Sequence, residues 1–304
     1  MDPHVPPDAP NQDTLLRFLL ARNGVRGVLV SLDEVWQEIR ARGSYPESLA
    51  GLLGEATSAA ALFTGHIKVE GRLSVQFKGR GALRTLFAEC THEGRLRGIA
   101  LWQPPLPEPL DLAHLGEDAV LAITIEGAAR QGREGLRQQG LVAVGQATLA
   151  RAFEDYFLQS EQLPTRLLLA ADARRARGLM LQVLPDSLRD EDAWPRTQAL
   201  FDTLGRTELL ETEPELLLHR LFHEEAPELL SRRALAFGCS CSRERVAGML
   251  LALGHEEARS ALEPATGVLD VRCEFCGQRY LFDAVDLEQL FAGGGIDPAT
   301  PTTH

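Results

Sequence analysis

Four cysteines near the C-terminal end of the chain constrain its fold more than any other feature. Cys239 and Cys241 form a C-x-C pair, Cys273 and Cys276 form a C-x-x-C pair, and 31 residues separate the two pairs. Two short pairs of thiols on either side of a small fold supply the four ligands that tetrahedral zinc requires. The C-x-C spacing is tighter than the C-x-x-C knuckles of ordinary zinc ribbons, so the chain there must be nearly extended. We therefore expect these four cysteines to bind one zinc ion per chain in the reduced state.

The segment around the cysteines, residues 237–291, has the pattern of a small module that depends on its metal. Apolar residues recur at the i, i+3, i+4 and i+7 positions of a helix that should end at Gly254: Val246, Met249, Leu250 and Leu253. The pattern then predicts a helix over 255–262, strands over 268–271 and 280–282, and a closing helix capped by Asp283. About 55 residues form too small a core to be stable alone. Zinc binding would therefore supply folding free energy on the order of 10 kcal/mol.

Residues 13–185 predict an α+β fold, a large mixed α/β domain with a mainly antiparallel sheet. Helices are expected around 15–19, 32–42, 46–63 and 146–159, and strands over 27–32, 66–69, 73–77, 83–89, 96–102, 119–126, 166–171 and 178–184. Several of these strands follow one another so closely that they should form hairpins, with glycines at the turns.

A helical linker is predicted over residues 186–236. Its first part, residues 186–228, contains 12 acidic and 4 basic residues, a net charge of −8. Apolar residues recur at helical spacing in it, among them Leu216, Leu217, Leu221 and Phe222. A helix with a weak apolar face and self-repelling charge needs a neighbour to stay folded. Outside these parts, residues 1–12 predict a disordered Pro-rich leader and residues 292–304 a disordered tail.

The charge and the cysteine usage narrow the class of partner and the compartment. The net charge of −12 and the pI of about 5.2 disfavour nucleic acid and anionic lipid as partners. We expect neither a signal peptide nor a membrane span, and hence a cytoplasmic protein. In that reducing compartment, paired cysteines indicate metal binding or redox switching rather than permanent disulfides. Cys90 stands alone in an apolar segment and is expected to be a small buried hydrophobe.

A thioredoxin-like site and a zinc deaminase site both fit the cysteines poorly. A thioredoxin-like site would place Cys273 at a helix N-terminus, but Gly277 and a predicted strand follow the pair. A zinc deaminase needs H-x-E followed by P-C-x-x-C, and Arg272 stands where the proline should be.

A metalloprotease site and a nucleic-acid-binding module are two further hypotheses for this chain. His219 and His223 have the i, i+4 spacing of a zincin, but Arg220 stands where the general-base glutamate should be. We therefore expect a solvated helical face there, no catalytic residue and no enzyme. Nucleic-acid binding by a zinc ribbon is the main alternative function, although residues 237–291 hold 9 acidic and only 5 basic residues.

Several stretches of the chain match the motifs of one known family. In the last module they are Phe237-Gly-Cys-Ser-Cys-Ser-Arg-Glu-Arg245, Cys273-Glu-Phe-Cys276, Tyr280 and Phe282-Asp283. In the first domain they are Leu52-Leu-Gly-Glu55, Gly79-Arg-Gly-Ala-Leu83 and Tyr156-Phe-Leu-Gln-Ser-Glu-Gln-Leu-Pro-Thr-Arg166. From about residue 13 to residue 291 the chain thus resembles the 33 kDa chaperonin (heat shock protein 33) family of bacterial redox-regulated chaperones. The departures are minor: the Pro-rich leader, and Gln139-Gly140 before Leu141-Val-Ala-Val144, where the family more often has an aromatic residue.

The resemblance implies an ATP-independent holdase that binds unfolded client proteins under oxidative stress. It implies that residues 13–185 carry the chaperone and dimerisation functions, and that residues 237–291 are the redox switch. Reduced members are zinc-bound and inactive. In oxidised members two disulfides form between neighbouring cysteines, which would be Cys239–Cys241 and Cys273–Cys276 in this chain, and zinc leaves. The C-terminal module then unfolds, the linker exposes a client-binding surface, and the protein forms homodimers. The C-x-C pair closes a small strained ring, so we expect it to oxidise after the C-x-x-C pair.

Overall fold

The computed structural model describes residues 13–66, 70–115, 118–127, 135–184 and 192–293. The chain divides into two compact units, Met1–Gly238 and Cys239–His304. The predicted leader, most of the predicted tail, and residues 186–191 of the predicted linker lie outside the described ranges.

The first unit contains two sheets and two groups of helices. Its strands are β1 (Thr14–Leu20), β2 (Val25–Leu32), β3 (Gly71–Lys78), β4 (Leu83–Thr91), β5 (Arg95–Trp102), β6 (Val120–Gly127), β7 (Arg137–Val142), β8 (Thr165–Ala171), β9 (Ala176–Val183), β10 (Pro227–Ala234) and β11 (Ala236–Phe237). Its helices are α1 (Glu34–Ala41), α2 (Glu47–Thr64), α3 (Leu149–Ser160), α4 (Ala193–Asp202), α5 (Arg206–Glu211) and α6 (Pro214–Phe222), with 3-10 turns η1 (Leu112–His114) and η2 (His223–Glu225).

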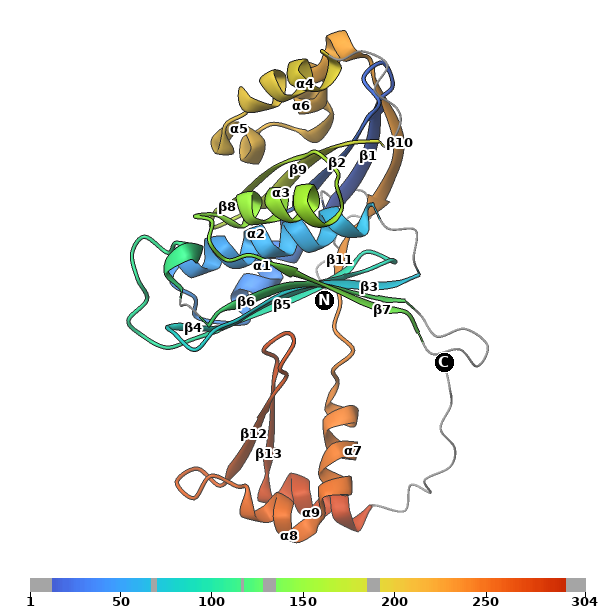
Figure 1. Ribbon diagram of the computed structural model, residues 1–304. Coiled ribbons are helices and arrows are strands. Elements are labelled where there is room, and N and C mark those ends of the chain that lie inside the picture. The colour runs from blue at the N-terminus through green and yellow to red at the C-terminus, as the bar shows by residue number, and fades with distance from the viewer. Residues whose placement is uncertain (1–12, 67–69, 116–117, 128–134, 185–191, 294–304) are drawn as a thin grey trace. The chain divides into compact units, whose positions relative to one another are not determined.

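These elements stack in layers (Figure 1). One sheet has the strand order β10-β1-β2-β9-β8 and the other β11-β5-β4-β3-β6-β7. All strand pairs of this unit are antiparallel except β11 with β5, so the predicted antiparallel α+β fold is confirmed for the described residues. Helix α2 packs against strands of both sheets. Because it is buried on all sides, it is rich in alanine, and Gly54 allows its close approach: a Cβ there would lie 2.5 Å from the Cβ of Ala171.

The first predicted helix, around residues 15–19, is wrong, because those residues form strand β1. The segment is apolar at almost every position, and a short apolar run does not distinguish a strand from a buried helix. In the fold β1 lies between β2 and β10 and is buried on both faces. Leu15 packs in the core between the two sheets, whereas Leu16 and Phe18 pack against the helices on the opposite face.

The prediction that residues 186–236 form a helical linker is also wrong in its last part. Helices α4–α6 account for most of 193–222, but residues 227–234 form strand β10, which pairs with β1. Residues 227–234 form a strand because their backbone hydrogen-bonds to β1, which lies about 200 residues earlier in the chain. A local sequence pattern does not report such a distant partner. The strand predicted over 66–69 lies, apart from His66, outside the described residues. Strand β7 has no counterpart among the predicted strands.

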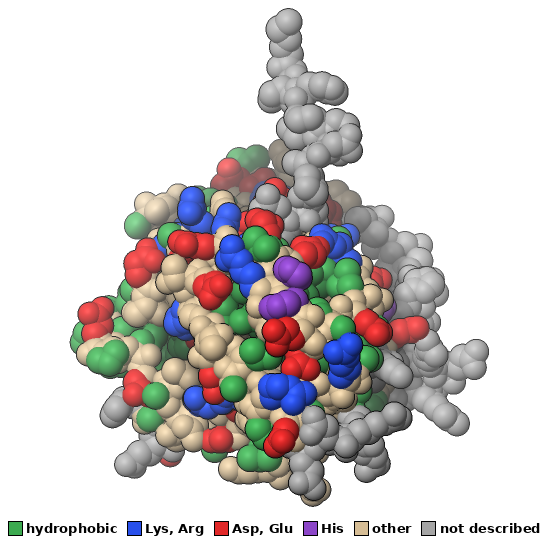
Figure 2. Space-filling view, turned by 90° about the horizontal axis from the view of Figure 1, so that it is seen from above, with side chains coloured by type: hydrophobic (Ala, Val, Ile, Leu, Met, Phe, Trp, Pro, Cys, Tyr) green, Lys and Arg blue, Asp and Glu red, His purple; other side chains and the backbone are tan. Residues whose placement is uncertain are grey.

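The acidic linker helices dock on the first sheet through an apolar face. Phe201, Leu209, Leu217 and Phe222 are buried in one cluster with residues of β1, β2 and β9. Three acidic side chains of this segment pair with arginines, as Arg166–Asp202, Arg232–Glu215 and Arg196–Glu225, and its Arg206 pairs with Glu55 of α2. Figure 2 looks down on this face and shows acidic and basic side chains interspersed over it. The neighbour that the linker needs is therefore the sheet of the first unit.

The ion pair between Arg206 and Glu55 ties α5 to the buried helix α2. Their closest atoms, Arg206 Nη1 and Glu55 Oε1, are 2.7 Å apart, and the Glu55 side chain is only 12% exposed. Burial raises the pKa of Glu55, and Arg206 opposes that rise. We expect Arg206→Ala to lower the free energy of unfolding by about 2 kcal/mol, less than for a fully buried pair, because Arg206 is half-exposed.

The pH dependence of that loss follows from the raised pKa. A carboxyl whose folded-state pKa is raised stabilises the fold below its unfolded pKa and loses this contribution as the pH rises through the folded value. The decrease in the free energy of unfolding caused by Arg206→Ala should therefore be larger at pH 7 than near pH 5, as measured by urea denaturation. Adding Glu55→Gln should restore most of the stability. An equal loss from Arg206→Ala with Glu55 or Gln at position 55 would show that the ion pair is not the cause.

The second unit follows its sequence pattern closely. It contains α7 (Arg243–Leu253), α8 (His255–Ser260), a hairpin of β12 (Val268–Arg272) and β13 (Arg279–Asp283), and α9 (Ala284–Ala292). The predicted Asp283 cap is confirmed, since the Asp283 carboxylate accepts from the Asp286 N–H at 2.7 Å. Its buried core is small and consists of Leu250, Ala258, Phe282 and Leu287. Of the apolar stripe predicted on α7 only Leu250 is buried, while Met249 and Leu253 are each 53% exposed. None of the described helices combines the length and apolarity that crossing a bilayer needs.

Candidate metal centre

The C-x-C pair is positioned by the start of α7. Cys239 follows Gly238 at the end of β11, and Cys241 directly precedes Ser242, the N-cap of α7. The Ser242 hydroxyl accepts from the backbone N–H of Arg245, and the Arg245 guanidinium donates to the Ser240 carbonyl at 2.7 Å. These bonds fix the short segment between the two thiols, so that helix capping holds the pair in place.

The C-x-x-C pair lies in the turn of the β12–β13 hairpin. The Cys273 N–H donates to the Gln278 carbonyl at 2.8 Å, and the Gly277 N–H donates to the Cys273 carbonyl at 2.9 Å. Gly277 has a φ of +74°, a conformation that glycine adopts without strain. The turn therefore presents both thiols on the same side of a tight loop.

The four sulfurs converge as the spacing predicted. Their Sγ atoms all lie within 4.8 Å of one another, with Cys239 to Cys273 at 3.8 Å and Cys241 to Cys276 at 3.5 Å. A tetrahedral ion with metal–sulfur bonds of about 2.3 Å would separate its ligands by about 3.8 Å. Among the described residues this is the only group of three or more cysteine, histidine or carboxylate ligands brought so close. The geometry fits zinc.

The four sulfurs need a nearby cation if all of them are to be thiolates. Burial raises the pKa of Cys276, and the neighbouring sulfurs raise it further. Burial likewise raises the pKa of Cys241, although a hydrogen bond with the Tyr280 side chain opposes that rise. Four thiolates cannot share so small a space without a positive charge to stabilise them. The donor set of four sulfurs is one that zinc accepts in closed sites.

Tyr280 is the site residue that the ligand spacing could not identify. Its hydroxyl hydrogen-bonds to Cys241 from strand β13, and the pKa of Tyr280 is raised by burial and by that contact. Such a contact orients a ligand without binding the metal. The available signal was the position of Tyr280, four residues after Cys276, at the start of the return strand.

The remaining candidates do not join the cluster. Cys90 lies in β4 of the first unit, fully buried in the core as expected, and burial raises its pKa to about 11. His255 lies 3.2 Å from Glu288 and packs on the ring of Phe291, so the deaminase-like pattern is not assembled. His219 of α6 and His223, the C-cap of that helix, are exposed and lie one turn apart.

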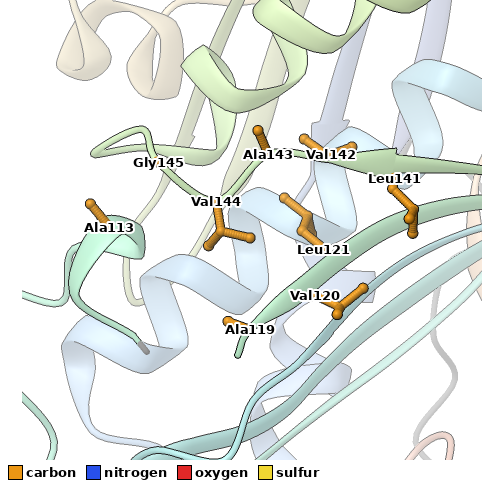
Figure 3. Close-up of a pocket in the computed structure, with 9 residues that line it drawn as sticks. All are labelled: Ala113, Ala119, Val120, Leu121, Leu141, Val142, Ala143, Val144 and Gly145. Carbon is orange, nitrogen blue, oxygen red and sulfur yellow. The ribbon is translucent and has the colours of Figure 1, made fainter. Parts of the chain in front are cut away.

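A shallow pocket in the first unit carries no such chemistry. It has a volume of about 590 Å³ and lies beside β6 and β7 (Figure 3). Its lining is formed by small and aliphatic residues, namely Ala113, Ala119, Val120, Leu121, Leu141, Val142, Ala143, Val144 and Gly145. No lining side chain can act as an acid, a base or a nucleophile, so this pocket supports no catalytic step.

Comparison with known proteins gives one consistent family. The family model described as Hsp33 protein matches residues 13–283. The 33 kDa chaperonin of Pseudomonas fluorescens strain SBW25 is 43% identical over 303 residues, which cover 98% of this chain and 99% of that protein. The 33 kDa chaperonin of Pseudomonas aeruginosa strain LESB58 is 41% identical over 300 residues, 97% of this chain and 99% of that one.

A solved structure agrees at the level of the fold. The crystal structure of the 33 kDa chaperonin (heat shock protein 33 homologue) of Thermotoga maritima matches with a TM-score of 0.74 at 23% identity, covering 93% of this chain and 98% of that chain. A family model that spans both the layered first unit and the cysteine cluster, together with relatives matched over nearly their whole length, shows that the chain belongs to the Hsp33 protein family.

Proposed function

We propose that this protein is a redox-regulated, ATP-independent holdase that is inactive when it is reduced and zinc-bound. The observation that carries the proposal is the cluster of four sulfurs within 4.8 Å, of which three belong to partly exposed residues. The cluster occurs in a chain whose curated relatives are named 33 kDa chaperonin. In this proposal the protein acts in the cytoplasm under oxidative stress, binds unfolded client proteins, and is not an enzyme.

The proposed switch begins with thiolate oxidation. Zinc, when bound, holds the sulfurs in the thiolate form, which is the reactive one. A thiolate attacks peroxide and becomes a sulfenic acid as one oxygen leaves as water, and a second cysteine then displaces the other oxygen as water. Each disulfide thus takes two electrons from the sulfurs and reduces one peroxide to two waters. We propose the pairs Cys273–Cys276 and then Cys239–Cys241, which together remove all four metal ligands.

The fold of the second unit supports the next step. Its core buries only four residues fully, so the loss of the metal ligands removes most of what keeps it folded. The C-x-C pair follows β11 after a single residue, and β11 follows the edge strand β10. We propose that unfolding there loosens β10, β11 and the linker helices, which uncovers the apolar sheet face for clients and allows a homodimer to form.

Light scattering of an unfolding client protein tests the proposal. Peroxide-treated protein should suppress aggregation, whereas the reduced, zinc-loaded protein should not. The same treatment should release about one zinc and consume four thiols, leaving Cys90 free because its buried thiol is protonated. Equal suppression in both states, or none in either, would rule out the switch.

A further inference from the structure

Helix α6 and its C-cap carry two exposed histidines, His219 in the helix and His223 at the cap, that the proposed redox switch does not use. His219 and His223 are one turn apart, and the His223 N–H donates to the His219 carbonyl. Both side chains are exposed, and their ring centroids lie 5.4 Å apart with the planes tilted by 49°. Histidine side chains lie next to each other on the face seen in Figure 2. The opposite side of the helix is committed to packing, with Leu217 and Phe222 fully buried.

The separation of the rings suits a shared metal ion. An imidazole nitrogen binds a divalent transition metal at about 2.0–2.1 Å, so two rings on one ion have centroids about 4.5 Å apart when the two bonds form a right angle and about 5.1 Å apart at a tetrahedral angle. The observed 5.4 Å is within about 1 Å of these separations, so rotation about the side-chain bonds can bring one nitrogen of each ring to a common ion. Two histidines at i and i+4 present this geometry whenever the helix is folded.

The charges beside the pair are mixed, because the Arg22 guanidinium donates to the backbone carbonyl of Glu224 at 3.4 Å. The exposed carboxylate of Glu224 lies 4.0 Å from His223 Nε2. The nearest arginine in the sequence, Arg220, has its guanidinium 3.9 Å from Glu208, which offsets its charge. Only the four cysteines bring three or more protein ligands together among the described residues, so water would complete the coordination at the histidines.

We propose that His219 and His223 form a two-histidine clip for a divalent transition-metal ion of the kind that prefers imidazole, namely zinc, nickel or copper. The clip is separate from the cysteine site and closes the last turn of α6. An ion that binds the folded helix and not the unfolded segment stabilises the folded state by mass action. If linker release activates the protein, a step that rests on the function proposed above, the bound ion would oppose that release.

Isothermal titration with Ni²⁺ tests the clip on the untagged, reduced, zinc-loaded protein. We expect one site in the wild type, and an affinity at least about 10-fold weaker in both His219→Ala and His223→Ala, since even supporting contacts change metal affinity by that factor. The matched control is His92→Ala, an exposed histidine of the first unit outside the linker. It should leave the binding unchanged.

Hydrogen exchange provides a second readout that does not depend on chaperone activity. Ni²⁺ should slow amide exchange over residues 214–225 in the wild type and in His92→Ala, but not in either variant of the pair. Absence of nickel binding in the wild type, or binding that survives in both His219→Ala and His223→Ala, would overturn the clip. Because no client and no oxidant is present, this result is independent of whether the holdase proposal holds.

Discussion

Replacing Cys273 and Cys276 together by serine is expected to abolish metal binding and to unfold the second unit. The two substitutions remove half of the four sulfurs that lie within 4.8 Å. A structural zinc contributes on the order of 10 kcal/mol to the folding of a small module. The remaining core of four buried residues cannot replace it. Zinc content and amide exchange over residues 243–292 measure the effect, and both should reach the values of an unstructured, metal-free segment.

The matched control for this experiment is Cys90→Ala. It also removes a thiol, but from the core of the first unit, where Cys90 has no part in the cluster. The control should keep about one zinc per chain and a protected second unit, although the buried cavity costs some stability of the first unit. A folded second unit in the serine variant would mean that its small core suffices without the metal.

The second unit could be predicted almost completely from the sequence because its signals are local. The C-x-C and C-x-x-C spacings identified the four cysteines whose sulfurs converge, Gly254 marked the end of α7, and Asp283 marked the start of α9. Each of these signals acts within a few residues of the position it determines. The site residue that the spacing missed, Tyr280, contacts Cys241 from another element, and no local pattern reports such a contact.

The first unit was harder to predict where its elements depend on distant partners. The apolar run of β1 is buried on both faces, so its pattern does not separate a strand from a helix. Strand β10 exists because β1 offers it an edge, and its own residues are mostly exposed, so its sequence shows no burial pattern. The acidic character of the linker was visible in the sequence. The sheet face that covers its apolar side and the arginines that neutralise it could be found only in the fold.

Phe222→Ala is expected to loosen the linker from the first sheet without any oxidation. Phe222 is fully buried, and its ring stacks on that of Phe18 with centroids 6.2 Å apart. Truncating a buried phenylalanine costs about 3–5 kcal/mol. Helix α6 has only nine residues and is held mainly by this packing, so the loss should appear first as faster amide exchange over residues 214–222 and as a lower urea midpoint.

The matched control lies on the same helix and faces solvent. Leu216 is 44% exposed, so Leu216→Ala changes the apolar content of α6 without opening a cavity and should leave the urea midpoint almost unchanged. If docking of the linker is what keeps the reduced protein inactive, reduced Phe222→Ala should suppress client aggregation without peroxide, and reduced Leu216→Ala should not. A reduced Phe222→Ala protein that exchanges rapidly over α6 but does not suppress aggregation would show that release of α6 is not sufficient for holdase activity. The packing argument would then stand, and release of the linker would be ruled out as the way in which the cysteine cluster controls the proposed holdase activity.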